Sequence, residues 1–159
     1  MSLLHRIHYR WWDRTLDRPM ALPVRDELSR GEWNAWVGQR GEALAAKAVW
    51  RSGRKLLYRN YRPKRGGEVD LIYRDGDILV FAEVKTRTSG EFGGPAKAVD
   101  REKRSLIIRG ASAWIKALHR PEGLLLRFDV IEVLLKDREV PQIRINEAVF
   151  ASSQQGLGM

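Results

Sequence analysis

Residues 67–85 read GEVDLIYRDGDILVFAEVK, two runs rich in β-branched and aromatic residues that meet at Asp75-Gly76. An Asp-Gly pair tolerates the positive φ angles of a two-residue type I′ turn, so the segment is predicted to form a β-hairpin. Both arms are apolar enough to be strands of a buried sheet, yet they contain three carboxylates and a lysine that the loop does not require. These charges make the hairpin the first candidate for a functional site.

The expected register follows from counting back from the loop. Phe81 is then opposite Asp70, and Glu83 is opposite Glu68. Because side chains alternate along a strand, the hairpin has two distinct faces. The polar face carries Glu68, Asp70, Glu83 and Lys85. The other face is expected to be core and carries Val69, Leu71, Tyr73, Ile78, Val80, Ala82 and Val84.

Asp70 and Glu83 are expected to hold one hard cation between them, because opposed and diagonal neighbours on paired strands lie about 5–8 Å apart. Mg²⁺ fits best, since it takes oxygen ligands, binds through one or two carboxylates and keeps waters that can become nucleophiles. Lys85 is expected to position such a water or to neutralise a phosphate oxygen. The constellation predicts phosphodiester cleavage. The alternative is ordinary surface charge on the solvated face of a half-exposed hairpin.

Two segments of the hairpin, 67–72 (GEVDLI) and 80–87 (VFAEVKTR), resemble the catalytic hairpin of the PD-(D/E)XK nuclease superfamily. More narrowly they resemble the YraN-like family, whose fold is similar to that of archaeal Holliday-junction resolvases. The resemblance extends to 38–42 (GQRGE) and 127–131 (RFDVI). It implies that Asp70 and Glu83 are metal ligands, Lys85 is the catalytic lysine and Glu42 is an additional acidic residue on the first helix. Val69 replaces the proline usual in the motif.

The composition fits one globular domain, since the chain has 159 residues of which 43% are hydrophobic. We expect an N-terminal extension over 1–31, a nuclease-like domain over 32–150 and a flexible tail over 151–159. The chain has no cysteine, which agrees with a cytoplasmic protein and makes any bound metal oxygen-ligated. No apolar run reaches the 18 or so residues of a membrane span, so no membrane association is expected.

Positive charge dominates the chain, with a formal net charge of +9 that predicts attraction to nucleic acid. Residues 51–65 contain seven basic and no acidic side chains, interleaved with Tyr58 and Tyr61, which suits phosphate contacts and base stacking. A polar loop follows Lys85 over residues 86–95, and a basic helix follows that loop. The expected nucleic-acid contacts are Arg62, Lys64, Arg65, Arg87 and Lys103. The alternative for the basic residues is a solubilising surface.

The hydrophobic periodicity predicts helices over 34–51 and 96–118 and strands over 55–60, 124–135 and 142–146, besides the hairpin. This order indicates an α/β protein with a mixed central sheet flanked by helices, resembling the restriction-endonuclease-like sandwich. In the strand over 124–135, Arg127 and Asp129 share one face and are expected to form a structural ion pair.

The first functional hypothesis is a Mg²⁺- or Mn²⁺-dependent nuclease that acts on DNA, branched DNA included. A non-catalytic nucleic-acid-binding protein that keeps the nuclease fold is the alternative from another class. A third hypothesis is a structural partner in a larger complex or a homodimer. That hypothesis rests on Trp11 and Trp12 in the N-terminal extension, because large aromatic residues are enriched in interfaces.

Overall fold

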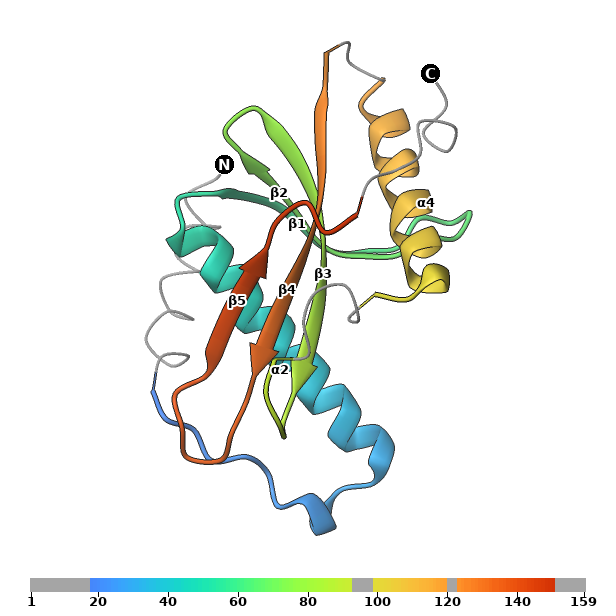
Figure 1. Ribbon diagram of the computed structural model, residues 1–159. Helices are drawn as coiled ribbons and strands as arrows, with labels where there is room; N and C mark the ends of the chain where they lie inside the picture. Colours follow the sequence, from blue (N-terminus) through green and yellow to red (C-terminus); the bar gives the residue numbers. More distant parts are fainter. Residues whose placement is uncertain (1–17, 93–98, 120–122, 151–159) are drawn as a thin grey trace, which may run out of the picture.

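The computed structural model describes residues 18–92, 99–119 and 123–150. Five strands form one sheet in sequence order (Figure 1): β1 (Lys55–Tyr61), β2 (Val69–Asp75), β3 (Ile78–Arg87), β4 (Leu125–Leu134) and β5 (Gln142–Asn146). The β3–β4 pair is parallel and the other three pairs are antiparallel. The described residues also form a short 3₁₀ helix η1 (Arg25–Glu27) and helices α2 (Arg30–Arg51) and α4 (Arg101–Ala117). The expected α/β class with a mixed, helix-flanked sheet is confirmed.

Helix α2 covers one face of the sheet. It begins at Arg30, earlier than the predicted Asn34, because Ser29 and Glu32 form a capping box. Its apolar side chains pack with those of the sheet in one core cluster, which includes Leu44, Val49, Leu71, Tyr73, Val80, Ala82, Ile131 and Val133. Gly41 crosses β3 so closely that a Cβ atom there would lie 1.7 Å from Thr86 Oγ1. The absence of a side chain at Gly41 therefore allows α2 to approach the strand that carries Glu83.

Helix α4 covers the other face, where it contacts β2 and β3 (Figure 1). Asp100 caps the helix by accepting a hydrogen bond from the Lys103 amide at 2.8 Å. The predicted segment 96–98 lies outside the described residues. The second core cluster contains Val69, Ile72, Leu79, Phe81, Val99, Ile107, Ala111, Phe128 and Val130. Leu118, which follows the end of the helix, does not join this cluster and is 45% exposed.

The hairpin register differs from the expected one by two residues. The loop is Gly76 and Asp77, and Ile72 rather than Asp70 lies opposite Phe81. Asp75 stays in β2 because its carboxylate accepts hydrogen bonds from Arg54 and Arg127, at 3.0 Å and 2.7 Å. A shift of two residues leaves Asp70 and Glu83 on the same face, as predicted. It also means that Asp70, one residue beyond the pair Leu71 and Ala82, continues the register directly opposite Glu83.

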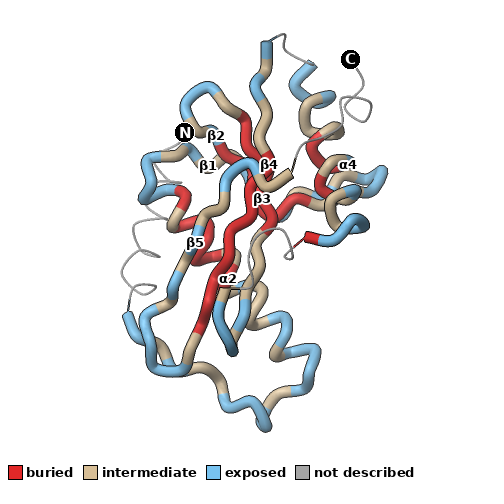
Figure 2. Tube along the Cα trace, in the orientation of Figure 1, coloured by how far each residue is buried: buried red, intermediate tan, exposed pale blue. Residues whose placement is uncertain are grey.

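The polar face of the hairpin is more buried than expected. Ile72, Leu79 and Phe81 alternate with the charged residues and pack beneath α4, so both faces of the hairpin belong to the core. Val69 was predicted to share a face with Leu71. It belongs instead to the core cluster beneath α4. Figure 2 shows the buried residues concentrated along the middle strands. The carboxylates therefore lie at the border of a core and not on a solvated surface.

Residues 18–29, at the end of the predicted N-terminal extension, contact the domain. Met20 forms an isolated bridge with Glu139, and the Leu22 amide donates a hydrogen bond to Asp137 at 2.8 Å. Trp11, Trp12 and the predicted tail 151–159 lie outside the described residues. In the part of the chain that the structure describes, no helix combines the length and apolar character needed to cross a membrane.

Candidate metal site

The centre of the candidate site is the pair Asp70 and Glu83, on the neighbouring strands β2 and β3. Both residues are buried, with 6% and 2% of their surface exposed. Asp70 Oδ2 accepts a hydrogen bond from the Val84 amide at 2.8 Å. The sheet fixes the positions of these two buried carboxylates, because core side chains pack against their strands on both faces.

The electrostatic consequence is visible at Asp70. Burial, together with the neighbouring Glu83 carboxylate, raises the pKa of Asp70 to about 7. The Val84 amide and Lys103 favour the ionised form but do not offset these effects. Near neutral pH Asp70 is therefore only partly ionised.

Two lysines contact the two carboxylate oxygens of Glu83. Lys85 Nζ lies 3.1 Å from Glu83 Oε1, and Lys103 Nζ lies 3.2 Å from Glu83 Oε2. The Lys103 ammonium is also 3.6 Å from Glu68 Oε1. Burial disfavours the charged form of Lys103, yet the carboxylates of Glu83, Asp70 and Glu68 raise its pKa above the ordinary value. The structure thus brings together Asp70, Glu83 and Lys85 as predicted and adds Lys103, which was expected only as a phosphate contact.

The remaining predicted nucleic-acid contacts are all exposed. Arg62 is 68% exposed and forms an ion pair with Glu68 at 3.0 Å. Lys64, Arg65 and Arg87 are exposed at the loop before β2 and at the end of β3. Tyr58 and Tyr61 form edge-to-face contacts with each other and with Trp114 of α4. Tyr61 packs against the second core cluster, whereas Tyr58 is 48% exposed.

Glu42, the fourth predicted catalytic residue, belongs to α2. This helix packs on the face opposite to α4, and no described interaction joins the Glu42 carboxylate to Asp70 or Glu83. Among the described residues there is also no group of three or more His, Cys, Asp or Glu side chains placed to hold a metal ion. The geometry therefore gives a pair of carboxylates as the acidic centre.

Sequence reasoning missed Glu132, which lies beside Lys85 on the adjacent strand β4. Glu132 is 2% exposed, and its Oε2 atom accepts a hydrogen bond from Asn146 at 3.1 Å. Its Oε1 atom is buried without a hydrogen-bond partner in the described structure. The signal in the sequence was the charge of Glu132 inside the apolar run 130–135, VIEVLL. A buried carboxylate oxygen without a partner is costly, and such groups are often functional.

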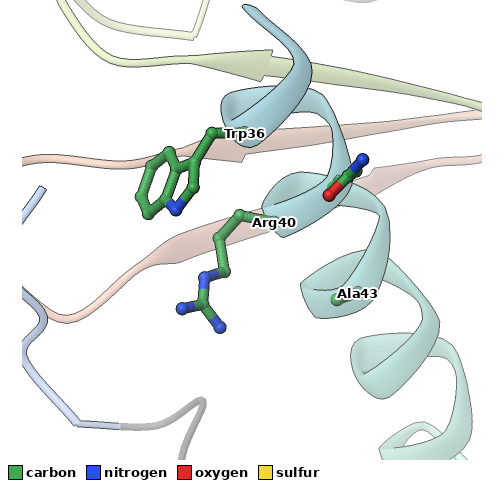
Figure 3. Close-up of a pocket in the computed structure, with 4 residues that line it drawn as sticks. Trp36, Arg40 and Ala43 are labelled. Atoms are coloured by element: carbon green, nitrogen blue, oxygen red, sulfur yellow. The ribbon is translucent and has the colours of Figure 1, made fainter. Parts of the chain in front are cut away.

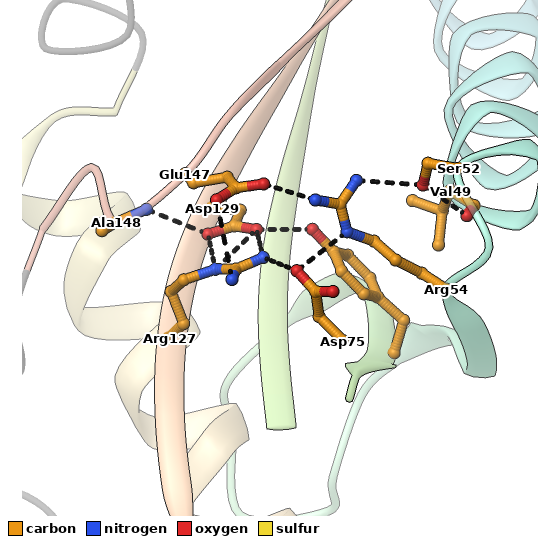
Figure 4. A network of polar contacts seen from close by, with 9 residues as sticks. Val49, Ser52, Arg54, Asp75, Arg127, Asp129, Glu147 and Ala148 are labelled. Carbon is orange, nitrogen blue, oxygen red and sulfur yellow. Dashed lines mark hydrogen bonds and ion pairs between the residues drawn. The ribbon is translucent and has the colours of Figure 1, made fainter. Parts of the chain in front are cut away.

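The predicted ion pair of Arg127 and Asp129 is confirmed, with the Arg127 Nε atom 2.9 Å from Asp129 Oδ1. Figure 4 shows that this pair belongs to a larger network. Tyr73 donates a hydrogen bond to Asp129 at 2.6 Å, and Asp75 links Arg127 to Arg54. Because the network connects β2, β4 and the residue preceding β1 and satisfies its buried charges, its role is structural.

A separate hollow of about 240 Å³ lies on α2 and is lined by Trp36, Gln39, Arg40 and Ala43. Figure 3 shows Trp36 and Arg40 projecting from the helix into it. The Arg40 guanidinium lies 5.7 Å from the centroid of the Trp36 ring, a cation–π contact. Neither carboxylate of the Asp70 and Glu83 pair lines this hollow, so it is distinct from the candidate metal site.

The donor set at the candidate site fits a hard divalent cation. Its ligands would be carboxylate oxygens, which Mg²⁺ and Mn²⁺ prefer, and one protein face with two carboxylates is the usual extent of Mg²⁺ ligation. The ammonium groups of Lys85 and Lys103, at 3.1 and 3.2 Å from the Glu83 oxygens, show that the site already accommodates positive charge.

The fold and the site together define a mixed α/β protein whose central sheet carries a buried acidic pair flanked by lysines. Residues 41–133 match the model of the uncharacterised protein family UPF0102, and the chain belongs to this family. This confirms the YraN-like resemblance at the level of the family.

The chain is similar to several UPF0102 proteins along most of their length. It is 44% identical to the one from Geobacter metallireducens over 110 residues, 69% of this chain and 88% of the relative. It is 41% identical to the protein from Anaeromyxobacter dehalogenans over 120 residues, covering 76% and 87% of the two chains. The protein from Chlorobaculum parvum is 41% identical over 126 residues, 76% of this chain and 96% of the relative.

Proposed function

We propose that this protein is a Mg²⁺- or Mn²⁺-dependent nuclease of the PD-(D/E)XK superfamily that hydrolyses phosphodiester bonds of DNA. The observation that carries the proposal is the buried pair of Asp70 and Glu83 with Lys85 3.1 Å from Glu83. The mixed sheet between two helices supports the finer assignment to the restriction-endonuclease-like sandwich.

The bound cation would supply Lewis acidity and an activated water. Asp70 and Glu83 are the residues that would hold it, and Glu42 is proposed as an auxiliary acidic residue. Lys85 orients the nucleophile and stabilises the negative charge that develops on the phosphate. Orienting the nucleophile and stabilising the phosphate both require a lysine that reaches solvent beside the carboxylates. Lys85 meets this requirement, because its side chain is 36% exposed whereas that of Glu83 is buried.

The two lysines are proposed to serve different states of the site. In the metal-free protein Lys85 and Lys103 neutralise Glu83. With a cation held by Glu83, Lys85 would be available to substrate, and Glu132 on the next strand is proposed as the carboxylate that positions it. The unpaired Oε1 atom of Glu132 supports this positioning role.

DNA is the proposed substrate, because a net charge of +9 and exposed cations on the approach to the site favour a polyanion. Arg62, Lys64, Arg65 and Arg87 are proposed phosphate contacts, and Lys103 acts nearest to the scissile phosphate. Branched DNA is among the candidate substrates. A non-catalytic nucleic-acid-binding protein is the second candidate function, and the contacts of both lysines with Glu83 favour it because they already compensate this carboxylate.

A cleavage assay with single-stranded, duplex, flap and four-way DNA, each with and without Mg²⁺ or Mn²⁺, tests the proposal. Lys85→Ala is expected to reduce metal-dependent cleavage at least about 100-fold, the scale on which single stabilising donors act. Its DNA affinity should change by less than about tenfold, or 1.4 kcal/mol.

The matched control is Lys116→Ala, which removes an exposed lysine in the last turn of α4. This variant should cleave within about twofold of the wild type. If the wild type binds these DNAs but cleaves none of them with either cation, the nuclease proposal is wrong and the binding protein replaces it.

A further inference from the structure

The face of the sheet that carries Glu83 and Lys85 continues beyond α4 onto the strands β4 and β5. In the parallel pair β3 and β4, Lys85 lies beside Glu132, and Arg87 lies beside Leu134. On the far side, Glu132 and Leu134 pair with Arg144 and Gln142 of β5. Figure 1 shows that the ends of β3 and β4 extend away from α4. A continuous strip of the sheet therefore leads from the candidate metal site to the β5 edge.

This strip ends in a hollow of about 380 Å³, lined by Glu91, Phe92, Leu134, Lys136, Gln142 and Arg144. Its volume falls within the range of small-ligand sites. The Arg144 guanidinium lies 4.4 Å from the centroid of the Phe92 ring, so that a planar cation and an aromatic ring form two layers. Lys136 adds a second cation, and the Gln142 amide adds both hydrogen-bond donors and an acceptor.

The chemistry of this hollow matches that of a nucleotide. Nucleobases stack on aromatic rings and on guanidinium planes, and phosphate oxygens accept from Lys and Arg. We propose that the hollow binds one unpaired nucleotide of the DNA strand that crosses the metal site, with its base stacked against the layers of Phe92 and Arg144. This inference rests on the proposed function.

The position of the hollow explains why the nucleotide must be unpaired. Neighbouring strands are about 4.8 Å apart, so Arg144, two strands from Lys85, is about 10 Å away across the sheet. A phosphate near Lys85 and a base at Arg144 thus belong to the same short stretch of strand. Within a duplex both faces of a base are covered by its stacked neighbours, and a base reaches such a pocket only when it is single-stranded or flipped out. The hollow therefore selects DNA with unpaired nucleotides beside the cleavage point.

Fluorescence anisotropy in EDTA, where no cleavage occurs, tests this inference with two probes. One probe is a blunt duplex, and the other is the same duplex with a four-nucleotide single-stranded tail. The wild type is expected to bind the tailed duplex at least about fivefold more tightly, the lower end of what stacking of one base contributes. Phe92→Leu keeps an apolar side chain and the net charge. It should abolish this preference while changing blunt-duplex affinity by less than about twofold.

Two further variants separate stacking from charge and from unfolding. Arg144→Lys keeps the positive charge but removes the planar guanidinium, and it should also lose most of the preference. Arg138→Ala removes an exposed cation from the turn between β4 and β5, where its side chain is 86% exposed, and should keep the preference. Melting temperatures confirm that each variant is folded.

The outcomes distinguish this inference from the proposed function. If the wild type binds both probes but Phe92→Leu and Arg144→Lys retain its preference, the nucleotide pocket is wrong and the nuclease proposal stands. If the wild type binds blunt and tailed DNA equally, the selection for unpaired nucleotides is wrong. If it binds neither probe, the proposed function fails with the inference.

Discussion

Replacing Asp70 by asparagine is expected to stabilise the metal-free protein, although Asp70 is a proposed metal ligand. Burial and Glu83 raise the pKa of Asp70 to about 7, from an ordinary value of 3.8. A raised carboxyl pKa means that the folded state binds a proton that the unfolded state has released. The stability associated with that proton is present below pH 3.8 and is lost as the pH rises through 7.

The size of this effect follows from the difference in pKa, about three units at about 1.4 kcal/mol each. Ionised Asp70 thus costs the folded protein about 4 kcal/mol above pH 7. Asparagine removes the charge, and its amide oxygen can still accept the hydrogen bond from Val84. Allowing for the buried amide, we expect Asp70→Asn to gain about 2–4 kcal/mol at pH 8. For a chain of this size, that gain corresponds to roughly 5–15 °C in melting temperature.

Thermal unfolding in EDTA at several pH values between 4 and 9 measures this gain. The advantage of Asp70→Asn should grow from pH 4 to pH 7 and stay constant above pH 7. Asp75→Asn is the matched control, because Arg127 and Arg54 lower the pKa of Asp75. It should destabilise the protein at neutral pH and lose this effect in acid. If Asp70→Asn is destabilising at pH 8, or its effect does not depend on pH, the inference that ionised Asp70 destabilises the folded protein is wrong.

DNA affinity should fall steeply with salt, and replacing Arg62, Lys64 and Arg65 together by Ala should flatten the slope of log K against log salt by roughly two to three. An unchanged slope would place the binding surface elsewhere. Gly110→Ala should cost about 1–3 kcal/mol in urea unfolding, since its Cβ atom would lie 2.7 Å from Val69 Cγ2. Gly38→Ala, where nothing lies within 4 Å, is the control and should not destabilise, and equal effects would contradict the close packing of α4. Glu132→Gln should lower metal-dependent cleavage about 10- to 100-fold with DNA affinity unchanged, as for other supporting residues. Full activity would remove Glu132 from the site.

The sequence predicted the faces of the hairpin but not its register. The alternation of side chains has a period of two residues, so an error of two in the pairing leaves Asp70 and Glu83 on the same face. The register itself depends on Asp75, which Arg54 and Arg127 retain in β2. These partners are distant in the sequence, and a local Asp-Gly pattern contains no information about them.

The strands and helices could be predicted because each follows from the hydrophobic periodicity of its own segment. The side chains that surround Glu83 could not be predicted in this way. Lys103 reaches the site from α4, and its position requires the close contact between Gly67 and Gly110, where a Cβ atom on Gly67 would lie 2.5 Å from the Gly110 nitrogen. Glu132 reaches the site through the parallel pairing of β3 and β4. Both placements depend on tertiary packing between segments far apart in the chain.

Calorimetric titration with Mn²⁺ at pH 8 tests most directly whether Asp70 and Glu83 form a cation site. The wild type is expected to bind one ion, and Asp70→Asn should weaken that binding at least about tenfold, equivalent to 1.4 kcal/mol. The control is Asp77→Asn in the loop of the same hairpin, where the side chain is 96% exposed, and it should bind like the wild type. Equal Mn²⁺ affinity of the wild type and Asp70→Asn would contradict the assignment of the metal site.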